Sequence, residues 1–477
     1  MRGVWRAEAV RAAEDALMRH TPEGALMQRA AAGLANRCAR LLGDVYGARV
    51  VLLVGAGNNG GDALYAGARL AQRGAQVHAL LLTPDRVHSD GMAALLRAGG
   101  RSGAPEPDRI SAADLVMDGI VGIGAQGELR PDAAELAVAA AESDALSVAV
   151  DIPSGVSPDT GAVVGEAFRA DLTVTFGCLK PGLVLAPGQT HAGVVDVIDI
   201  GLGPHLGAVH AQVPDLLDVA AWLPEPGPLD DKYTRGVVGI AAGSETYQGA
   251  ALLSVGGAVH GFAGMVRYTG HAADAVRTRW PEVVVSDGGP ADAGQVQAWV
   301  VGPGLGTDAR AAAIVRDVLA SHVPVLVDAD GLTVLAQHPE WVRERSADTL
   351  LTPHDREFVR LAGDVGEDRI AAARRAAADL GATVLLKGEA SVICSPGGEV
   401  TVDPVSCPWL ATAGSGDVLS GLAGSLLAGG LSAPRAATAA AFLHGLSGRL
   451  ASGGGPISAT DLLAALPEAG RTALSAQ

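Results

Sequence analysis

The stretch VVLLVGAGNNGGD, from Val50 to Asp62, joins a short apolar run to a glycine-rich turn that closes on an aspartate. A buried strand that ends in glycines and then opens a helix is typical of the first βα unit of a parallel sheet. Glycine-rich turns let backbone N–H groups gather around an anion, because glycine tolerates positive φ angles and has no Cβ. The stretch therefore predicts an α/β fold with a ligand-binding loop at the carboxyl end of this strand.

A second glycine-rich turn, ATAGSGDVLSG from Ala411 to Gly421, lies near the other end of the chain and closes on Asp417. Around both turns, short β-branched runs alternate with alanine-rich amphipathic stretches, as expected for parallel sheets covered by helices. Two such turns, each with its own strands and helices, predict two active sites.

The apolar runs give the expected strands, and two helices, Trp5–Met18 and Ala25–Leu42, are expected to precede them. In the first half we expect strands at Val50–Val54, Gln76–Leu82, Leu115–Met117, Ser147–Val150, Leu172–Thr175 and Val194–Ile200. In the second half we expect strands at Val237–Ala241, Met265–Tyr268, Ala298–Val301, Val325–Val327 and Thr383–Leu386.

The chain of 477 residues exceeds what one hydrophobic core usually organises, so we expect two domains. The pattern of strands and helices lapses between Gly201 and Tyr233, and LPEPGPLDD (Leu223–Asp231) has the composition of a linker. We place the domains at residues 1–223 and 224–477. The predicted fold class is α/β, with an N-terminal Rossmann-like three-layer sandwich followed by a second α/β domain.

The net charge of −17 argues against a nucleic-acid backbone or an anionic membrane surface as a partner. The four scattered cysteines show no metal-binding spacing and predict reduced, buried thiols. The N-terminus lacks the apolar core of a signal peptide, so we expect a cytoplasmic protein with small-molecule substrates. We also expect it to form a homo-oligomer.

The first turn contains a literal GxGxxG, Gly55 to Gly60, so an NAD(P)-dependent redox site is one interpretation. That fingerprint requires an acid at the end of the next strand, to hold the ribose. Here Asp85 follows only after Pro84, which is a poor position. The asparagines and Asp62 also fill the turn with oxygen atoms, which suit a cation better than a bare pyrophosphate.

Two more expected strands end in acids, Asp118 and Asp151. Asn59, Asp118 and Ser154 supply hard oxygen ligands that could converge on one cation. A carboxylate at the end of a strand often only caps the next helix. Three strand ends of this kind in one sheet make a shared site the better interpretation, with Asp151 as a candidate acid or base.

The motifs GNNGGD, DGIVGIG, VDIPSG and TFGCLKPGLVLAPG (Thr175–Gly188) together resemble the NAD(P)H-hydrate epimerase domain, over about Trp5 to Gly203. The resemblance implies that Asp151 is catalytic and that Asn59, Asp118 and Ser154 bind potassium. It implies that the hydrated nucleotide is bound by two loops, namely Asn58, Asn59, Gly60, Gly61 and Asp62, and Gly122, Ile123, Gly124, Ala125, Gln126, Gly127 and Glu128.

In the second turn, Gly414-Ser415-Gly416-Asp417 is expected to open a helix. Its N-terminal amides and dipole would hold a phosphoryl group, and Asp417 could take the proton of an attacking hydroxyl. The alternative is that this segment only starts a helix and has no catalytic role. A P-loop NTPase is excluded, because GxxxxGK[ST] does not occur in the sequence.

The ordered motifs DKYTRG, VVGPGLG, VDADGL, LTPHDREF and LLKGEASVI, with GSGD, resemble the ADP-dependent NAD(P)H-hydrate dehydratase of the ribokinase-like superfamily, over about Asp230 to Leu463. The resemblance implies ADP with Mg²⁺ as phosphoryl donor, catalysis by Asp417 and contacts of Gly304 and His354 with the hydrated cofactor. It also implies nucleotide binding by Lys387, Gly388, Glu389, Ala390, Ser391, Cys407, Thr412, Ala413, Gly414, Ser415 and Gly416. Relatives usually have Pro-Gly where this chain has Asp355-Arg356.

Both resemblances together predict a bifunctional repair enzyme for NADHX and NADPHX, the hydrated forms of the reduced nicotinamide cofactors. It would interconvert the R and S hydrates and dehydrate the S form, releasing AMP and phosphate. The alternative is a ribokinase-like kinase of a small alcohol or vitamin with a non-catalytic N-terminal binding module. That alternative leaves Asp118 and Asp151 without a role.

Overall fold

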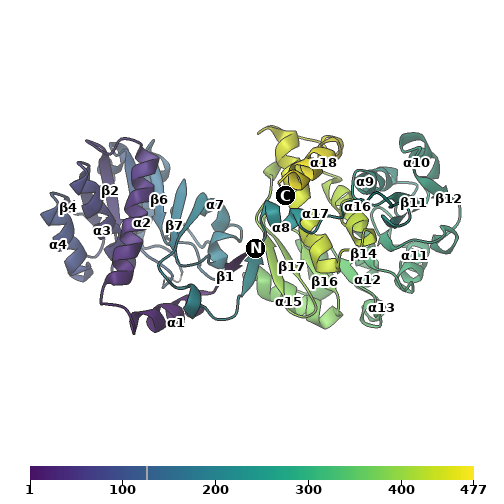
Figure 1. Ribbon diagram of the computed structural model, residues 1–477, viewed down its shortest axis with the longest axis horizontal. Helices are drawn as coiled ribbons and strands as arrows, with labels where there is room; N and C mark the ends of the chain where they lie inside the picture. The colour runs from purple at the N-terminus through teal and green to yellow at the C-terminus, as the bar shows by residue number, and fades with distance from the viewer. Residues whose placement is uncertain (125–126, 477) are drawn as a thin grey trace. The chain divides into compact units, whose positions relative to one another are not determined.

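The structure is a computed structural model that describes residues 1–124 and 127–476. Its chain forms two compact units, Gly3–Ala211 and Gln212–Gln477 with Met1–Arg2 (Figure 1). The units divide about a dozen residues before the predicted boundary at 223/224. The reason is that residues 211–220, expected to be irregular, form a strand and a helix. The strand pairs through Gln212 with β18 (Val400–Asp403), and the helix packs against α18 (Ala459–Leu474).

The N-terminal unit contains a parallel sheet in the order β4-β3-β2-β5-β6-β7-β8. After strand β1 (Arg2–Val4), its strands are β2 (Arg49–Val54), β3 (Gln76–Leu81), β4 (Arg101–Gly103), β5 (Leu115–Gly119), β6 (Leu146–Val150), β7 (Leu172–Phe176) and β8 (Val194–Ile198). Its helices are α1 (Ala7–Met18), α2 (Ala25–Leu42), α3 (Asn58–Gln72), α4 (Ser89–Arg97), α5 (Asp108–Ser111), α6 (Pro131–Ala141) and α7 (Gly188–Ala192).

Strand β2 shows how the sheet becomes the middle of three layers. Val50, Leu52 and Val54 join a core with α1, α2 and α3. The alternate residues Val51 and Leu53 join a second core with α5 and α6. A strand that is buried on both faces has a continuous apolar sequence. This is why the sequence predicts β2. The predicted Rossmann-like three-layer sandwich is confirmed.

In the larger sheet, the strands of the C-terminal unit follow the order β9-β18-β17-β16-β15-β14-β13-β10-β11-β12, and among these described pairs β16–β17 and β17–β18 are antiparallel and the others parallel. Its strands are β9 (Ala211–Val213), β10 (Val237–Ala241), β11 (Met265–Thr269), β12 (Val284–Ser286), β13 (Ala298–Val301), β14 (Val325–Val327), β15 (Thr349–Leu351), β16 (Thr383–Leu386), β17 (Ser391–Cys394) and β18 (Val400–Asp403).

Helices cover both faces of this sheet as well. Val238 and Ile240 of β10 pack towards α9, α16, α17 and α18, whereas Val237 and Ala241 pack towards α11, α12 and α13. The helices are α8 (Leu216–Ala220), α9 (Gln248–Val259), α10 (Ala273–Arg279), α11 (Ala309–Leu319), α12 (Asp330–Leu335), α13 (Glu340–Arg343), α14 (Asp355–Ala362), α15 (Arg369–Leu380), α16 (Ser415–Ala428), α17 (Ala433–Ser452) and α18 (Ala459–Leu474).

The four cysteines are buried as free thiols, as expected. Among the described residues, no helix combines the length and the apolar character that a membrane crossing requires.

Candidate active sites

The oxygen-rich residues of the N-terminal unit meet just beyond the carboxyl ends of β2 and β5. Asp118 is fully buried, and its Oδ2 accepts a hydrogen bond from the Ser154 amide at 2.8 Å while its Oδ1 accepts one from the Ser154 hydroxyl at 2.7 Å. The Ser154 hydroxyl also accepts from the Val121 amide, whose carbonyl accepts from Asn59 Nδ2 at 2.8 Å. The structure thus brings Asn59, Asp118 and Ser154 together around one loop.

This cluster has the chemistry of a site for a hard cation. Burial raises the pKa of Asp118 to about 6, against the hydrogen bonds from Ser154 and Ile120 that lower it. The backbone of Gly122 lies so close to Asn59 that a Cβ there would stand 3.2 Å from Asn59 Oδ1. The cluster brings a carboxylate, an amide oxygen and a hydroxyl together in one buried place. Hard cations prefer oxygen ligands of this kind.

Asp151 follows β6 and sits in the left-handed region, with φ of 65°. Its Oδ1 accepts hydrogen bonds from Lys180 Nζ at 2.6 Å, from the Thr175 hydroxyl at 3.0 Å and from the Phe176 amide at 3.2 Å. Lys180 is 1% exposed, and its ammonium also donates to Thr175 Oγ1 and the Phe176 carbonyl. Among the described residues every hydrogen bond to this carboxylate goes to Oδ1, so Oδ2 is the oxygen left for a ligand.

Two further acids lie near Asp151. Burial raises the pKa of Asp62 well above its usual range, and the charges of Asp151 and Glu14 raise it further. Burial, followed by the charge of Asp151, likewise raises the pKa of Glu14. Asp62 Oδ1 is buried without a hydrogen-bond partner in the part of the chain that is described. A buried acid that keeps its proton next to a paired carboxylate is a common arrangement in acid–base sites.

The first predicted nucleotide loop contains Asp62 itself, and the second follows β5. The segment Asn58 to Asp62, with Gly60 and Gly61, forms the first turns of α3, and Gly57 before it has φ of 96°. In the loop after β5, the carbonyl of Ile123 accepts a hydrogen bond from Arg11 of α1 at 2.8 Å, and Gly124 follows it. Ala125 and Gln126 of the predicted set lie outside the described residues.

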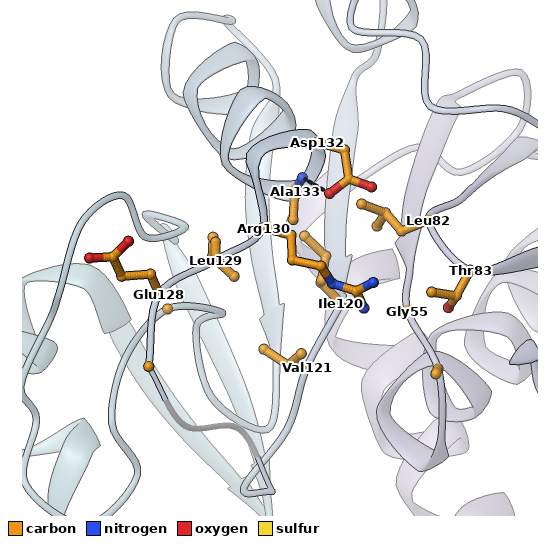
Figure 2. A pocket seen from close by; sticks show the side chains of 13 residues that line it. Gly55, Leu82, Thr83, Ile120, Val121, Glu128, Leu129, Arg130, Asp132 and Ala133 are labelled. Carbon is orange, nitrogen blue, oxygen red and sulfur yellow. Dashed lines mark hydrogen bonds between the residues drawn. The ribbon is translucent and has the colours of Figure 1, made fainter.

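A cavity of about 340 Å³ opens next to this loop, and Gly127 and Glu128 help to line it (Figure 2). The other lining residues follow the ends of β2, β3, β5 and β6 or begin α6; they are Gly55, Ala56, Leu82, Thr83, Ile120, Val121, Leu129, Arg130, Asp132, Ala133 and Gly155. The strand order reverses between β2 and β5. Ligands of open α/β sheets bind at such a switch point.

In the C-terminal unit, Asp417 occupies the first turn of α16, after Gly414 in the left-handed conformation. Burial raises the pKa of Asp417 to about 7, and the charges of Asp328, Asp330 and Glu357 add to burial while Lys387 opposes it. None of the described residues donates a hydrogen bond to its carboxylate. Such a carboxylate is suited to act as a general base near neutral pH.

Lys387 links the acids around Asp417. Its Nζ lies 2.7 Å from Asp328 Oδ1 and 3.8 Å from Glu357 Oε2. Burial alone would lower the pKa of Lys387, but the charges of Asp328, Glu357 and Asp417 outweigh burial and raise it. A Cβ at Gly416 would stand 3.6 Å from Nζ, so the ammonium lies against the first turn of α16. The cation and the helix N-terminus together form a site for an anion.

A cavity of about 720 Å³ extends from Lys387 to α17. Of the predicted residues it is lined by His354, Lys387, Gly388, Glu389, Ser391, Cys407, Thr412, Ser415 and Gly416. The predicted residues Ala390, Ala413 and Gly414 adjoin these in sequence but are not among the lining residues, and neither is Asp417. The volume falls in the range of 300–1,000 Å³ that small-molecule sites occupy.

Gly304 and His354, both predicted to contact the hydrated cofactor, lie on different elements. Gly304 has φ of 63°, and a Cβ there would stand 2.8 Å from Ala250 and 2.9 Å from Tyr247, so Gly304 lets its loop pack against the start of α9. His354 caps α14 through Nδ1, which accepts from the amides of Arg356 and Glu357. Its Nε2 lies 3.5 Å from Glu357 Oε1, and His354 lines the cavity.

The substitution of Asp355-Arg356 for the usual Pro-Gly has a structural consequence. Arg369 Nη1 lies 2.8 Å from Asp355 Oδ1, and Arg369 Nη2 donates to the Lys387 carbonyl at 2.9 Å. Asp355 therefore helps to position the arginine that holds the backbone of the lysine loop.

Sequence reasoning did not single out several residues that complete these sites. They are Glu14, Thr175 and Lys180 in the first unit, and Asp328, Glu357, Ser420 and His444 in the second. Most of them lie within motifs that were recognised, but only the fold shows that they face the site. Ser420, for example, donates to Asp328 Oδ2 at 2.5 Å.

The two units thus form a Rossmann-like and a ribokinase-like α/β protein with one candidate site in each. The profile of the family described as YjeF-related protein N-terminus matches residues 23–182, and the profile of the family described as NAD(P)H-hydrate dehydratase matches residues 238–467. A relative from Mycobacterium leprae, a bifunctional NAD(P)H-hydrate repair enzyme, is 50% identical over the full length of both chains. Another from Mycobacterium tuberculosis with the same name is 52% identical, over 92% of this chain and 91% of the relative. The chain belongs to the family of bifunctional NAD(P)H-hydrate repair enzymes.

Solved structures resemble the C-terminal unit. The ADP/ATP-dependent NAD(P)H-hydrate dehydratase of Bacillus subtilis, co-crystallised with ATP and Mg²⁺, is 26% identical and gives a TM-score of 0.50, covering 56% of this chain and all of that one. A ribokinase-like superfamily protein from Enterococcus faecalis gives a TM-score of 0.50 at 24% identity, over 56% of this chain and 98% of that one. The predicted ribokinase-like fold is confirmed.

Proposed function

We propose that this chain epimerises the R and S hydrates of NADH and NADPH in its N-terminal unit and dehydrates the S form in its C-terminal unit, with ADP as phosphoryl donor. The observation that carries the proposal is that Lys387 and Asp417, whose charges interact, lie at the first turn of α16 next to a cavity of about 720 Å³. The start of α16 thus has a base, a cation and a helix N-terminus in one place.

In the dehydratase site, Asp417 accepts the proton of the ring hydroxyl as that oxygen attacks the β-phosphorus of ADP. The bond from that phosphorus to its bridging oxygen breaks, and AMP leaves. Lys387 and the amides of Ser415 and Gly416 stabilise the charge on the phosphoryl oxygens. Phosphate then departs from the ring carbon while the neighbouring carbon loses a proton, which restores the double bond. Bound Mg²⁺, carried with the nucleotide, would supply further neutralisation of phosphate charge.

In the epimerase site, the configuration can change only if the bond between the ring carbon and its hydroxyl breaks and re-forms on the other face. Asp62, whose raised pKa keeps a proton available, is suited to protonate the leaving hydroxyl, so that water departs with the help of the ring nitrogen. Water then adds to the opposite face and loses a proton to Asp151. Lys180 Nζ lies 2.6 Å from Asp151 Oδ1 and orients this carboxylate.

We further propose that Asn59, Asp118 and Ser154 hold potassium. Their buried oxygens support this, and a cation would offset the cost of keeping Asp118 ionised. Because the pKa of Asp118 is about 6, the effect of potassium should be stronger at pH 8 than at pH 5. Replacing potassium with sodium or lithium at constant ionic strength should lower epimerase activity and the melting temperature. Equal values in all three salts, with Asp118→Asn as the control variant, would contradict the site.

The experiment that tests the function uses the purified chain and a mixture of R and S hydrated NADH. With ADP and Mg²⁺, the absorbance of reduced nicotinamide should rise until both epimers are consumed. Without nucleotide, the protein should only interconvert the epimers, which chromatography would detect. If no reduced nicotinamide forms with ADP or with ATP, the proposal is wrong. The choice of ADP, the cytoplasmic location and the homo-oligomeric state stay predictions, and size-exclusion chromatography tests the last.

A further inference from the structure

The cavity of about 340 Å³ in the N-terminal unit lies where a Rossmann-like sheet places the adenosine end of a dinucleotide. Gly55 follows β2, Thr83 follows β3 and Ile120 follows β5, so the cavity spans the end of the strand after the glycine-rich turn. In this fold the end of that next strand faces the ribose 2′ position, where an acid holds a 2′-hydroxyl and an arginine accommodates a 2′-phosphate.

The end of β3 carries no acid facing the cavity. The residues after the strand are Leu82 and Thr83, and Asp85 is not among the cavity-lining residues. Thr83 Oγ1 is a buried atom with no hydrogen-bond partner in the described parts of the chain. A buried hydroxyl without a partner is costly, so it points to a ligand that supplies one.

Arg130 supplies the positive charge. It precedes α6, lines the same cavity, and extends its guanidinium between Ile120 and Thr83 (Figure 2). No described residue forms a hydrogen bond or an ion pair with it. Arg49 of the same unit, by contrast, is paired with Asp114 at 2.9 Å. A free guanidinium aimed into a cavity is suited to bind phosphate oxygens.

One carboxylate of the cavity, that of Asp132, would repel a phosphate group. Asp132 lines the cavity on the side of Leu82, and its Oδ1 accepts a hydrogen bond from the Ala133 amide at 2.9 Å. It is thereby tied to the first turn of α6, whose positive dipole end offsets part of its charge. Glu128 lies at the far side of the cavity from Thr83 in Figure 2.

We infer that this cavity binds the adenosine end of the hydrated dinucleotide and that Arg130 and Thr83 recognise a ribose 2′-phosphate, so that the epimerase unit favours hydrated NADPH over hydrated NADH. The inference rests on the proposed epimerase activity. It assigns a substrate preference that the motifs leave open.

The test measures kcat/KM of epimerisation for both hydrates with the full-length protein. The wild type should favour hydrated NADPH. Arg130→Ala should lower kcat/KM for hydrated NADPH by about 10- to 100-fold, the value of a charge-assisted hydrogen bond, and change that for hydrated NADH by less than about twofold. Thr83→Val should cause a smaller loss, again confined to hydrated NADPH. Arg40→Ala, which removes an exposed arginine of α2, is the control for net charge and should change neither.

The outcomes separate the inference from the function on which it rests. If the wild type epimerises neither hydrate, the proposed function fails. If it epimerises both and Arg130→Ala lowers both equally or neither, only the inference is overturned. A wild-type preference for hydrated NADH that Asp132→Asn abolishes would also overturn it, since Asp132 would then hold the ribose 2′-hydroxyl. A second readout is inhibition of epimerisation, where adenosine 2′,5′-bisphosphate should be stronger than AMP, and Arg130→Ala should remove the difference.

Discussion

The two candidate catalytic aspartates have opposite surroundings. Asp151 in the N-terminal unit is bound to a buried ammonium, a hydroxyl and an amide through one oxygen. Asp417 in the C-terminal unit receives no hydrogen bond from the described residues and lies among the acids Asp328 and Glu357, which help to raise its pKa to about 7. The same residue type is therefore tied to hydrogen-bond donors in one unit, whereas in the other it has no described donor and a raised pKa.

The comparison extends to the backbone. Asp151 itself adopts a φ of 65°, whereas in the second unit Ala329, next to Asp328, adopts a φ of 51°. A residue with a Cβ in this region costs about 1–3 kcal/mol, and such strain is concentrated at functional sites. Among the described residues, each unit thus holds one non-glycine residue with positive φ near the end of a parallel strand: Asp151 directly follows β6, and Ala329 lies two residues after β14. In the first unit this residue is the proposed catalytic base, and in the second it is the neighbour of Asp328, the partner of Lys387.

The largest expected effect separates the two sites. Asp417→Asn should lower the rate of ADP-dependent dehydration by about 10³-fold, because the hydroxyl loses its base, and leave epimerisation within about twofold. Rates with purified S hydrate and ADP, and with R hydrate alone, provide the two readouts. Parallel losses of both activities would show that the units do not act as separate sites.

The next effect concerns the ion pair of the N-terminal unit. Asp151→Asn should lower epimerisation by about 10²-fold without changing dehydration of the S hydrate. Lys180→Met should also abolish epimerisation and lower the melting temperature, because it leaves a buried carboxylate uncompensated, at a cost of about 3–5 kcal/mol. An Asp151→Asn enzyme with an unchanged epimerisation rate would remove the assigned role of Asp151.

A smaller effect follows from the pKa of Asp417. The base acts as the carboxylate, so kcat/KM for dehydration should rise with pH and level off above about 7. At pH 6 it should be about tenfold below the plateau, since about a tenth of Asp417 is then ionised. A rate that stays constant from pH 8 to pH 5 would contradict a base with this titration point.

Much of this architecture could be predicted from the sequence. The strands β10, β13, β14 and β16 have the predicted bounds, because buried parallel strands are continuous apolar runs between turn residues. The short strands β1, β4, β12, β15, β17 and β18 were missed, since three or four residues leave too little pattern. Strand β9 and α8 were missed because they lie between Gly201 and Tyr233, where the pattern of strands and helices lapses.

The sites were predictable to a similar degree. Turn glycines, the strand-end acid Asp118 and the acid Asp417 at the start of a helix stand out because each occupies a recognisable position in the alternation of strands and helices. Lys180 does not, because a lysine in an apolar stretch is normally a solvated side chain, and only the fold shows that its ammonium is buried against Asp151. Arg130 does not stand out in the sequence either, because only the fold shows that it lines the cavity of the N-terminal unit.

The most direct test of two separate sites in one chain is a mixing experiment with the two variants. Purified R hydrate of NADH and ADP are added to full-length Asp151→Asn, to full-length Asp417→Asn, and to an equal mixture of both. With either variant alone, reduced nicotinamide should form no faster than spontaneous epimerisation allows, and a protein-free control measures that rate. The mixture should form reduced nicotinamide at a rate close to that of the wild type. A mixture no more active than the better single variant would contradict the account.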